Sequence, residues 1–158
     1  MRKAETFTFS ALISIALLGM VLHGSCTPES CYEDTESAVK AGFYETGTGK
    51  NIAADSVTAY GIGMESLLLY KAAKAKKEIF LPLNPTTDEC SFVVSINGIT
   101  DTITLTYSSF PHLISKECGY SVFHTLESYS SSNNIIDTVI IRNSNVTIPY
   151  EENIRIFF

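Results

Sequence analysis

Residues 91–107 read Ser-Phe-Val-Val-Ser-Ile-Asn-Gly-Ile-Thr-Asp-Thr-Ile-Thr-Leu-Thr-Tyr, and this stretch decides the fold class. Two runs rich in β-branched and aromatic residues flank the dipeptide Asn97-Gly98. Asn-Gly between such runs is the strongest short signal for a β-hairpin, because both residues tolerate a positive φ. The sequence therefore predicts two antiparallel strands, 91–96 and 99–107, joined at this dipeptide.

A two-residue turn sets the register of this hairpin and pairs Phe92 with Ile103. The same register places Asp101 opposite Val94 on the apolar face. A carboxylate is a misfit among apolar side chains, so we expect a β-bulge or a wider loop. Beyond it, three residues at every second position are expected to face the core: Ile103, Leu105 and Tyr107.

The rest of residues 38–158 shows the same period of two, in short strands separated by turn residues. Pro82 indicates an edge strand or a bulge, and residues 135–142, apolar on both faces, indicate a central strand. About eight strands predict an all-β fold. We expect a single antiparallel β-sandwich of the immunoglobulin or fibronectin type, with about seven to nine strands.

Residues 64–77 fit two local structures. Their leucines, alanines and lysines favour a helix by propensity alone. Because the chain elsewhere has a period of two, consistency favours a hairpin made of residues 66–70 and 76–83.

The N-terminal residues have the features of a secretory signal. Arg2 and Lys3 give a positive start, an apolar run extends over residues 7–22, and Gly24-Ser25 precede Cys26. This arrangement resembles a bacterial lipobox, which implies cleavage before Cys26 and lipidation of its thiol. We therefore predict an N-terminal lipid that holds the protein on a membrane.

One position departs from that pattern, because His23 stands where an aliphatic residue is usual. Ordinary signal cleavage, which leaves Cys26 unmodified, is the alternative. The predicted organisation is a lipoprotein signal peptide (1–25), a lipidated cysteine with an acidic tether (26–37) and a β-sandwich domain (38–158).

Charge and cysteine content restrict the function further. The formal net charge of −6 becomes about −7 once residues 1–25 are removed, and an acidic chain without a basic arm is a poor nucleic-acid binder. With Cys26 lipidated, three thiols allow three pairings. We favour a disulfide between Cys31 and Cys118 with Cys90 free, because long loops are the most stabilised in chain-entropy terms.

Five short motifs occur in order: Tyr60-Gly61-Ile62-Gly63, Leu81-Pro82-Leu83-Asn84, the strand Thr102–Tyr107, Glu117-Cys118-Gly119-Tyr120 and Asn145-Val146-Thr147. By their order and spacing the whole chain resembles an uncharacterised family of small lipoproteins from Bacteroidales, known only as a domain of unknown function. The resemblance implies a lipoprotein signal and a β-rich domain, and it implies no activity. Cys31 and Cys118 look like positions of this family.

No motif predicts catalysis. His112 and His124 lack the spacing of a metal-binding pair, and neither Cys-x-x-Cys nor Gly-x-Ser-x-Gly occurs. Gly47-Thr48-Gly49-Lys50 is better explained as a hairpin turn than as a phosphate loop. We therefore expect no catalytic residue, no metal site and no cofactor, in a protein that is not an enzyme.

Three tripeptides share the form aspartate, hydroxyl residue, aliphatic residue. This form resembles the O-glycosylation acceptor of exported Bacteroidetes proteins, and the candidate acceptors are Ser56, Thr102 and Thr138. The ordinary explanation is that turns favour Asp and that strands begin with hydroxyl and β-branched residues. We expect any modified site to lie at a strand edge.

Three functions remain open, and each predicts a different surface. A non-enzymatic outer-membrane lipoprotein, on the periplasmic or cell-surface side, would bind an unknown envelope protein through an exposed apolar patch without convergent titratable groups. A hydrolase needs a cleft where His112 or His124 meets a carboxylate and a hydroxyl. A glycan-binding accessory module needs tyrosines aligned on one face or at loop tips, from among Tyr60, Tyr70, Tyr107 and Tyr120. If Cys26 is not lipidated, the first function becomes that of a soluble periplasmic binding protein.

Overall fold

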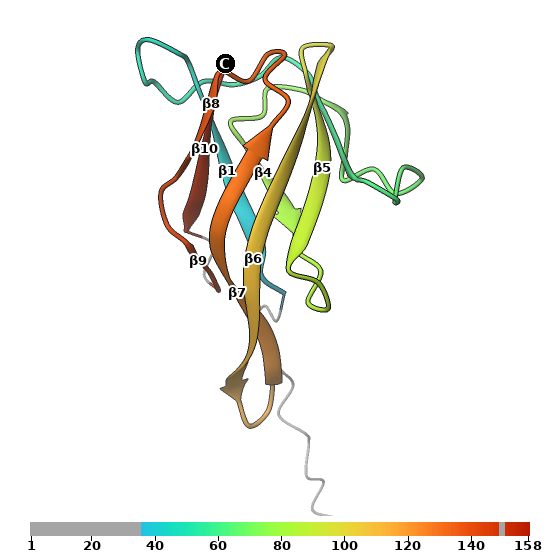
Figure 1. The fold of residues 1–158 in the computed structure, drawn as a ribbon, viewed down its shortest axis with the longest axis vertical. Coiled ribbons are helices and arrows are strands. Elements are labelled where there is room, and N and C mark those ends of the chain that lie inside the picture. Colours follow the sequence, from blue (N-terminus) through green and yellow to red (C-terminus); the bar gives the residue numbers. More distant parts are fainter. Residues whose placement is uncertain (1–35, 149–150) are drawn as a thin grey trace, which may run out of the picture. The chain divides into compact units, whose positions relative to one another are not determined.

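Two β-sheets form the part of the chain that the computed structural model describes, residues 36–148 and 151–158 (Figure 1). The four-stranded sheet has the order β4 (Glu78–Pro82), β1 (Ala38–Tyr44), β10 (Glu152–Phe157), β8 (Thr138–Ile141). The six-stranded sheet has the order β3 (Tyr70–Ala73), β2 (Val57–Gly61), β5 (Glu89–Ile96), β6 (Ile99–Ser115), β7 (Gly119–Ser131), β9 (Asn145–Val146). Among these residues there is no helix long and apolar enough to cross a membrane. The predicted all-β sandwich is confirmed; the ladder between β1 and β10 is parallel, and the other ladders are antiparallel.

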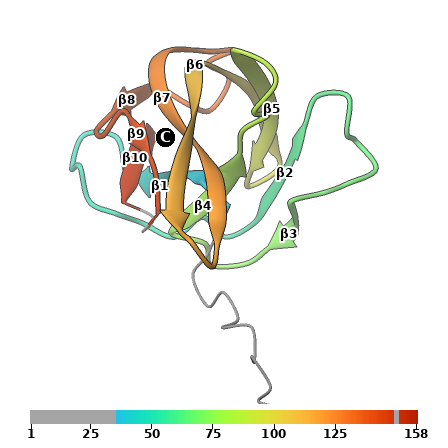
Figure 2. The ribbon, with the colours of Figure 1, turned by 90° about the horizontal axis from the view of Figure 1, so that it is seen from below.

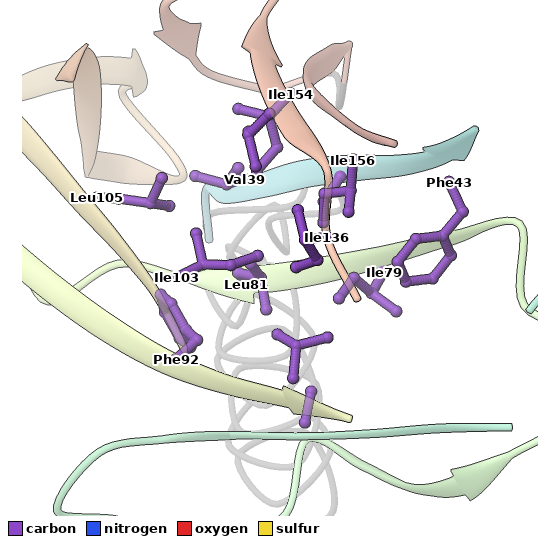
Figure 3. Packing of buried hydrophobic residues seen from close by; sticks show 14 of the residues in the cluster. Val39, Phe43, Ile79, Leu81, Phe92, Ile103, Leu105, Ile136, Ile154 and Ile156 are labelled. Atoms are coloured by element: carbon purple, nitrogen blue, oxygen red, sulfur yellow. The ribbon is translucent and has the colours of Figure 1, made fainter. Parts of the chain in front are cut away.

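The core lies between the two sheets (Figure 3). Val39, Ile154 and Ile156 project from the four-stranded sheet, and Ile103 and Leu105 come from the six-stranded sheet. All five side chains are fully buried. The alternation read from the sequence therefore selects the correct inward face of β6, because consecutive residues of a strand point to opposite sides.

The hairpin of β5 and β6 keeps a regular register through its two-residue turn. Asn97 and Gly98 both have a positive φ, 51° and 88°, as the Asn-Gly signal requires. Phe92 pairs with Ile103 and Val94 with Asp101, without a register shift along the ladder. The expected bulge or wider loop is therefore wrong, and Asp101 does face the core.

Asp101 is accommodated because a distant segment supplies hydrogen-bond donors to it. Its Oδ1 accepts from Ser132 Oγ at 2.5 Å and from the Asn134 backbone N–H at 2.6 Å. Its Oδ2 accepts from the backbone N–H groups of Ile135 and Ile136 at 2.8 and 2.9 Å. Burial alone would raise the pKa of Asp101, but these four bonds outweigh it and hold the pKa below its ordinary value. The carboxylate thus fixes the path of the β7–β8 connection over the core.

Residues 135–142 do not form a central strand, which corrects a sequence prediction. β8 is an edge strand that pairs in the ladders only with β10. Ile136 and Val139 are buried, whereas Ile140 is 47% exposed. The apolar run consists of a buried connection followed by a strand with one buried and one exposed face. Pro82, in contrast, lies in the edge strand β4, as predicted.

The segment 64–77 is neither a helix nor the preferred hairpin. β3 joins β2 in the six-stranded sheet, and β4 joins β1 in the four-stranded sheet. The segment therefore crosses from one sheet to the other. Ala72 and Ala75 have positive φ values of 45° and 53°, which interrupt any regular helix at the crossing.

β6 and β7 are much longer than the strands beside them and extend as a two-stranded projection (Figures 1 and 2). The β5–β6 ladder ends at the pair Glu89–Thr106, whereas the β6–β7 ladder continues to Ser115–Gly119. We name residues 108–115 and 119–122 the β6–β7 arm. At its other end β7 continues to Ser131, into a polar stretch rich in serine and asparagine.

Candidate functional site

The loop between β2 and β3, residues 62–69, exposes a concentration of large apolar side chains. Leu67 is 67% exposed, and four neighbours are also exposed: Ile62, Met64, Leu68 and Leu69. Exposed apolar groups gathered in one patch are typical of interaction surfaces. The sequence pattern predicts only the local structure of this segment and does not indicate a site.

Backbone hydrogen bonds hold this loop in a defined shape. The N–H of Met64 donates to the Gly61 carbonyl and that of Leu67 to the Met64 carbonyl, both at 2.9 Å. Leu69 N–H donates to the Ala59 carbonyl at 2.8 Å, and Gly63 adopts a φ of 84°. These backbone groups bond to one another in successive turns, and the leucine side chains point outward. A leucine run that fits neither a period of two nor a period of 3.6 was the available sequence signal.

A groove of about 690 Å³ lies against this loop. We call it the apolar groove; Ile62, Met64, Leu67 and Leu69 line it from the loop, and Leu83, Asn84, Pro85, Cys90 and Phe92 are among its remaining lining residues. Its size is that of a site for a small ligand or a few side chains of a partner. Glu89 is its single carboxylate and no histidine lines it. Such a lining favours apolar contact over acid–base chemistry.

The Tyr107 hydroxyl holds the connection between β4 and β5, which contains Asn84 and also borders the apolar groove. It donates to the Asn84 carbonyl at 2.8 Å and accepts from the Asn84 N–H at 3.1 Å. Cys90 Sγ and Thr87 Oγ1 lie 3.0 and 3.1 Å from the same oxygen. Burial raises the pKa of Tyr107 to about 12, with a further contribution from the Cys90 thiol, so the phenol is neutral at physiological pH.

Replacing Tyr107 with phenylalanine should lower the free energy of unfolding by about 1–3 kcal/mol, because both backbone groups of Asn84 lose a buried partner. Urea unfolding measures the loss, and hydrogen exchange should show faster exchange of the Asn84 amide. Tyr129→Phe is the matched control, since Tyr129 is exposed, and should change stability by less than about 0.5 kcal/mol. An unchanged Asn84 amide in the Tyr107→Phe variant would show that the hydroxyl does not hold the loop.

Cys90 is a free thiol among the described residues. It pairs in the ladder with Leu105, whereas Cys118 lies beyond the pair Leu113–Tyr120, next to the turn that ends the arm. Roughly ten strand residues separate these two levels, which corresponds to about 30 Å. Because a disulfide needs Cα atoms within about 7 Å, the pairing of Cys90 with Cys118 is excluded.

His124 makes a histidine–hydroxyl contact with Ser109. Its Nδ1 lies 2.8 Å from Ser109 Oγ, directly across the two strands. The ring is 2% exposed and packs edge-on against Tyr107, and burial lowers the pKa of His124. We assign this pair to packing: His124 borders a hollow of about 450 Å³ that Glu36 and Ser37 also line, but an imidazole only 2% exposed is poorly accessible to a substrate. Ser109 was not singled out from the sequence, and the register of the arm is what brings it to His124.

The other predicted residues are dispersed. His112 lies on the arm, stacked 4.4 Å from the Phe123 ring. Of the tyrosines, Tyr107 is buried and Tyr70 Oη accepts from the Phe80 N–H, while Tyr120 is 72% exposed on the arm. Within the described ranges no three His, Cys, Asp or Glu side chains gather as metal ligands.

The three candidate O-glycosylation residues occupy different environments. Thr138 is exposed at the start of the edge strand β8. Thr102 lies within β6, between β5 and β7, and Ser56 is half-buried, with its N–H donating to the Asn97 side chain at 3.1 Å. Of the three, Thr138 is the one at a sheet edge, and its modification stays a prediction.

The remaining predictions concern the N-terminal residues. The signal peptide, lipidated Cys26, most of the tether and Cys31 lie outside the described residues. Glu36 and Ser37 are described, and Ser37 Oγ donates to the Val122 carbonyl at 2.6 Å. The chain therefore enters the sandwich beside the arm.

Comparison with known proteins gives one match. The model of a protein family described as a family of unknown function (DUF6452) matches residues 56–158. The chain matches no curated protein and no solved structure.

Proposed function

The chain belongs to the DUF6452 family of unknown function, and from that premise we propose that it is a non-enzymatic, outer-membrane-anchored lipoprotein. Its sandwich domain binds another envelope protein through the apolar groove and the exposed loop 62–69. The single observation that carries the binding function is this loop, whose large apolar side chains border the groove. An exposed apolar patch of this kind marks an interaction site, and its lining lacks the convergent titratable groups of an active site.

The membrane anchor is supported by the sequence. A positive start, a short apolar run and small residues before Cys26 are the features of an exported lipoprotein. Acyl chains at Cys26 would hold the chain stably on a membrane, because each buried methylene contributes about 0.8 kcal/mol.

A disulfide between Cys31 and Cys118 completes the proposal. The Ser37–Val122 hydrogen bond puts the start of the domain alongside the arm, four residues from Cys118. Five residues separate Ser37 from Cys31; the six Cα–Cα steps between them span up to about 20 Å, which is sufficient to reach the turn at the end of the arm. Cys90 is too far from Cys118 to compete, as shown above.

The glycan-binding alternative receives less support. It requires tyrosines aligned as stacking platforms, but Tyr107 is buried and Tyr70 is held by a hydrogen bond from β4. Tyr120 alone is strongly exposed, and it lies on the arm. Tyr60 lies on β2 and is half-buried, so the four residues do not share one exposed face.

The anchor is tested by the intact mass of the protein extracted in detergent from its own membrane. A mass that begins at Cys26 and includes acyl chains is the expected result, with a gain of about two daltons on reduction for one disulfide. An unacylated chain would contradict the anchor and favour a soluble periplasmic binding protein.

The binding surface is tested by photo-cross-linking in intact cells. A photoreactive amino acid at Leu67 should cross-link one protein, whereas the same group at Tyr129, also exposed, should not. Adding Met64→Asp to the Leu67 variant should abolish the product, because it places a charge in the apolar lining. Equal products from Leu67 and Tyr129, or a product that survives Met64→Asp, would contradict binding at the groove.

A further inference from the structure

We propose that the β6–β7 arm is a second membrane contact, which inserts its apolar end into the lipid surface that holds Cys26. This inference rests on the anchor proposed above and assigns a role to a part of the domain that the apolar groove does not use.

The arm is a projecting ladder whose pairs lie beyond the end of β5. Its register pairs Pro111 with Val122 and Leu113 with Tyr120. Figure 1 shows the two strands continuing past the neighbouring strands of the sheet. The side chains near its end are therefore presented away from the core.

The arm exposes three large apolar or aromatic side chains and is nearly neutral. Phe110 is 42% exposed, Leu113 is 49% exposed and Tyr120 is 72% exposed. At the turn, Lys116 and Glu117 balance each other in charge. Tyrosine is favoured at membrane–water interfaces, because its ring is apolar and its hydroxyl remains hydrated.

The first described residues of the chain lie beside the arm. Ser37 is bonded to Val122 of the arm, and ten residues separate Ser37 from Cys26, a reach of at most about 36 Å. If Cys31 is bonded to Cys118, only residues 27–30 separate the lipidated cysteine from the end of the arm, a reach of about 17 Å. The lipid and the apolar end of the arm must then lie close to one membrane surface.

This closeness favours lipid over a protein as the partner of the arm. The lipid anchor keeps the arm at the membrane and so raises its effective concentration there. A weak contact by a few apolar side chains is then populated. No complementary protein surface is needed for such a contact, and the near-neutral turn carries little penalty at the headgroups.

Fluorescence quenching by lipid tests the proposal, because the chain contains no tryptophan. The full lipoprotein, carrying Leu113→Trp, is extracted in detergent and reconstituted into phosphatidylcholine vesicles with or without brominated acyl chains. Ile99→Trp is the matched control, since Ile99 and Leu113 are both 49% exposed and Ile99 follows the turn at the opposite end of β6. Tyr120→Trp reports from the facing strand of the arm.

Brominated lipid should reduce the emission of both arm variants by about twofold, as for side chains at the interface, and leave that of Ile99→Trp unchanged. If the variants float with the vesicles but the arm tryptophans are not quenched, the arm contact is overturned while the anchor stands. Equal quenching at Ile99 would also overturn it, because the contact would not belong to the arm. A protein that does not float with the vesicles would overturn the anchor and this inference together.

Discussion

Replacing Asp101 with asparagine should lower the free energy of unfolding by about 3 kcal/mol, measured by urea denaturation at pH 7. The carboxylate is 1% exposed and accepts four hydrogen bonds. An asparagine retains one acceptor oxygen, so in either orientation its amide nitrogen must face at least one backbone N–H group, that of Asn134 or those of Ile135 and Ile136. Burying an unsatisfied donor costs about 1–3 kcal/mol, and two donors face each oxygen of the native residue.

Asp55→Asn is the matched control, because Asp55 begins the same aspartate–hydroxyl–aliphatic pattern but is exposed. It should change the free energy of unfolding by less than about 0.5 kcal/mol.

The same variant has a pH signature. The pKa of Asp101 is lowered in the folded state relative to its ordinary value of about 3.9. Its contribution to stability is therefore fully present above that ordinary value and is lost as the pH falls through the folded pKa. The stability difference between the native protein and Asp101→Asn should shrink in acid. A difference that does not depend on pH would show that the ionised carboxylate is not its cause.

Replacing Ile156 with alanine should lower the free energy of unfolding by about 2–5 kcal/mol, because the side chain is fully buried between the sheets. Ile140 provides a matched control on the neighbouring strand β8, where it pairs with Arg155. At 47% exposure, Ile140→Ala should cost well under half as much. Equal losses in the two variants would indicate that both faces of β8 are buried and would contradict the exposure of Ile140.

That control also marks a limit of sequence interpretation. An apolar run such as residues 135–142 looks the same in a central strand and in a buried connection that leads into an edge strand. Ile136 is buried because its own backbone N–H donates to the carboxylate of Asp101. Asp101 lies thirty-five residues earlier in the sequence. Local periodicity carries no information about that distant partner.

The features that could be predicted are local. Turn chemistry predicts the Asn97-Gly98 turn, and side-chain alternation predicts the inward face of β6. The edge position of Pro82 follows because proline has no backbone N–H to donate to a neighbouring strand. The two-residue turn predicts the observed register of Asp101, but an isolated carboxylate at that position is costly, and this cost favours a bulge. Sequence alone did not show that residues 132–136 would supply its donors.

The candidate site was less predictable than the fold. Loop 62–69 carries good helix formers, yet backbone turns and the crossing between two sheets override that propensity. The groove is made by residues from this loop, the β4–β5 connection and β5, and only the tertiary structure brings these together. The Ser109–His124 contact likewise depends on a register set by the arm.

The parallel pairing of β1 with β10 has a consequence for the order of assembly during synthesis. β10 lies between β1 and β8 in the four-stranded sheet, yet its residues are translated after those of every other described strand. β1, translated first among them, cannot complete its pairing until residues 152–157 have left the ribosome. Contacts so distant in sequence make folding slow and leave unpaired strand edges exposed in the meantime. The nascent chain therefore exposes unpaired strand edges to chaperones until β10 is available and the sheet closes.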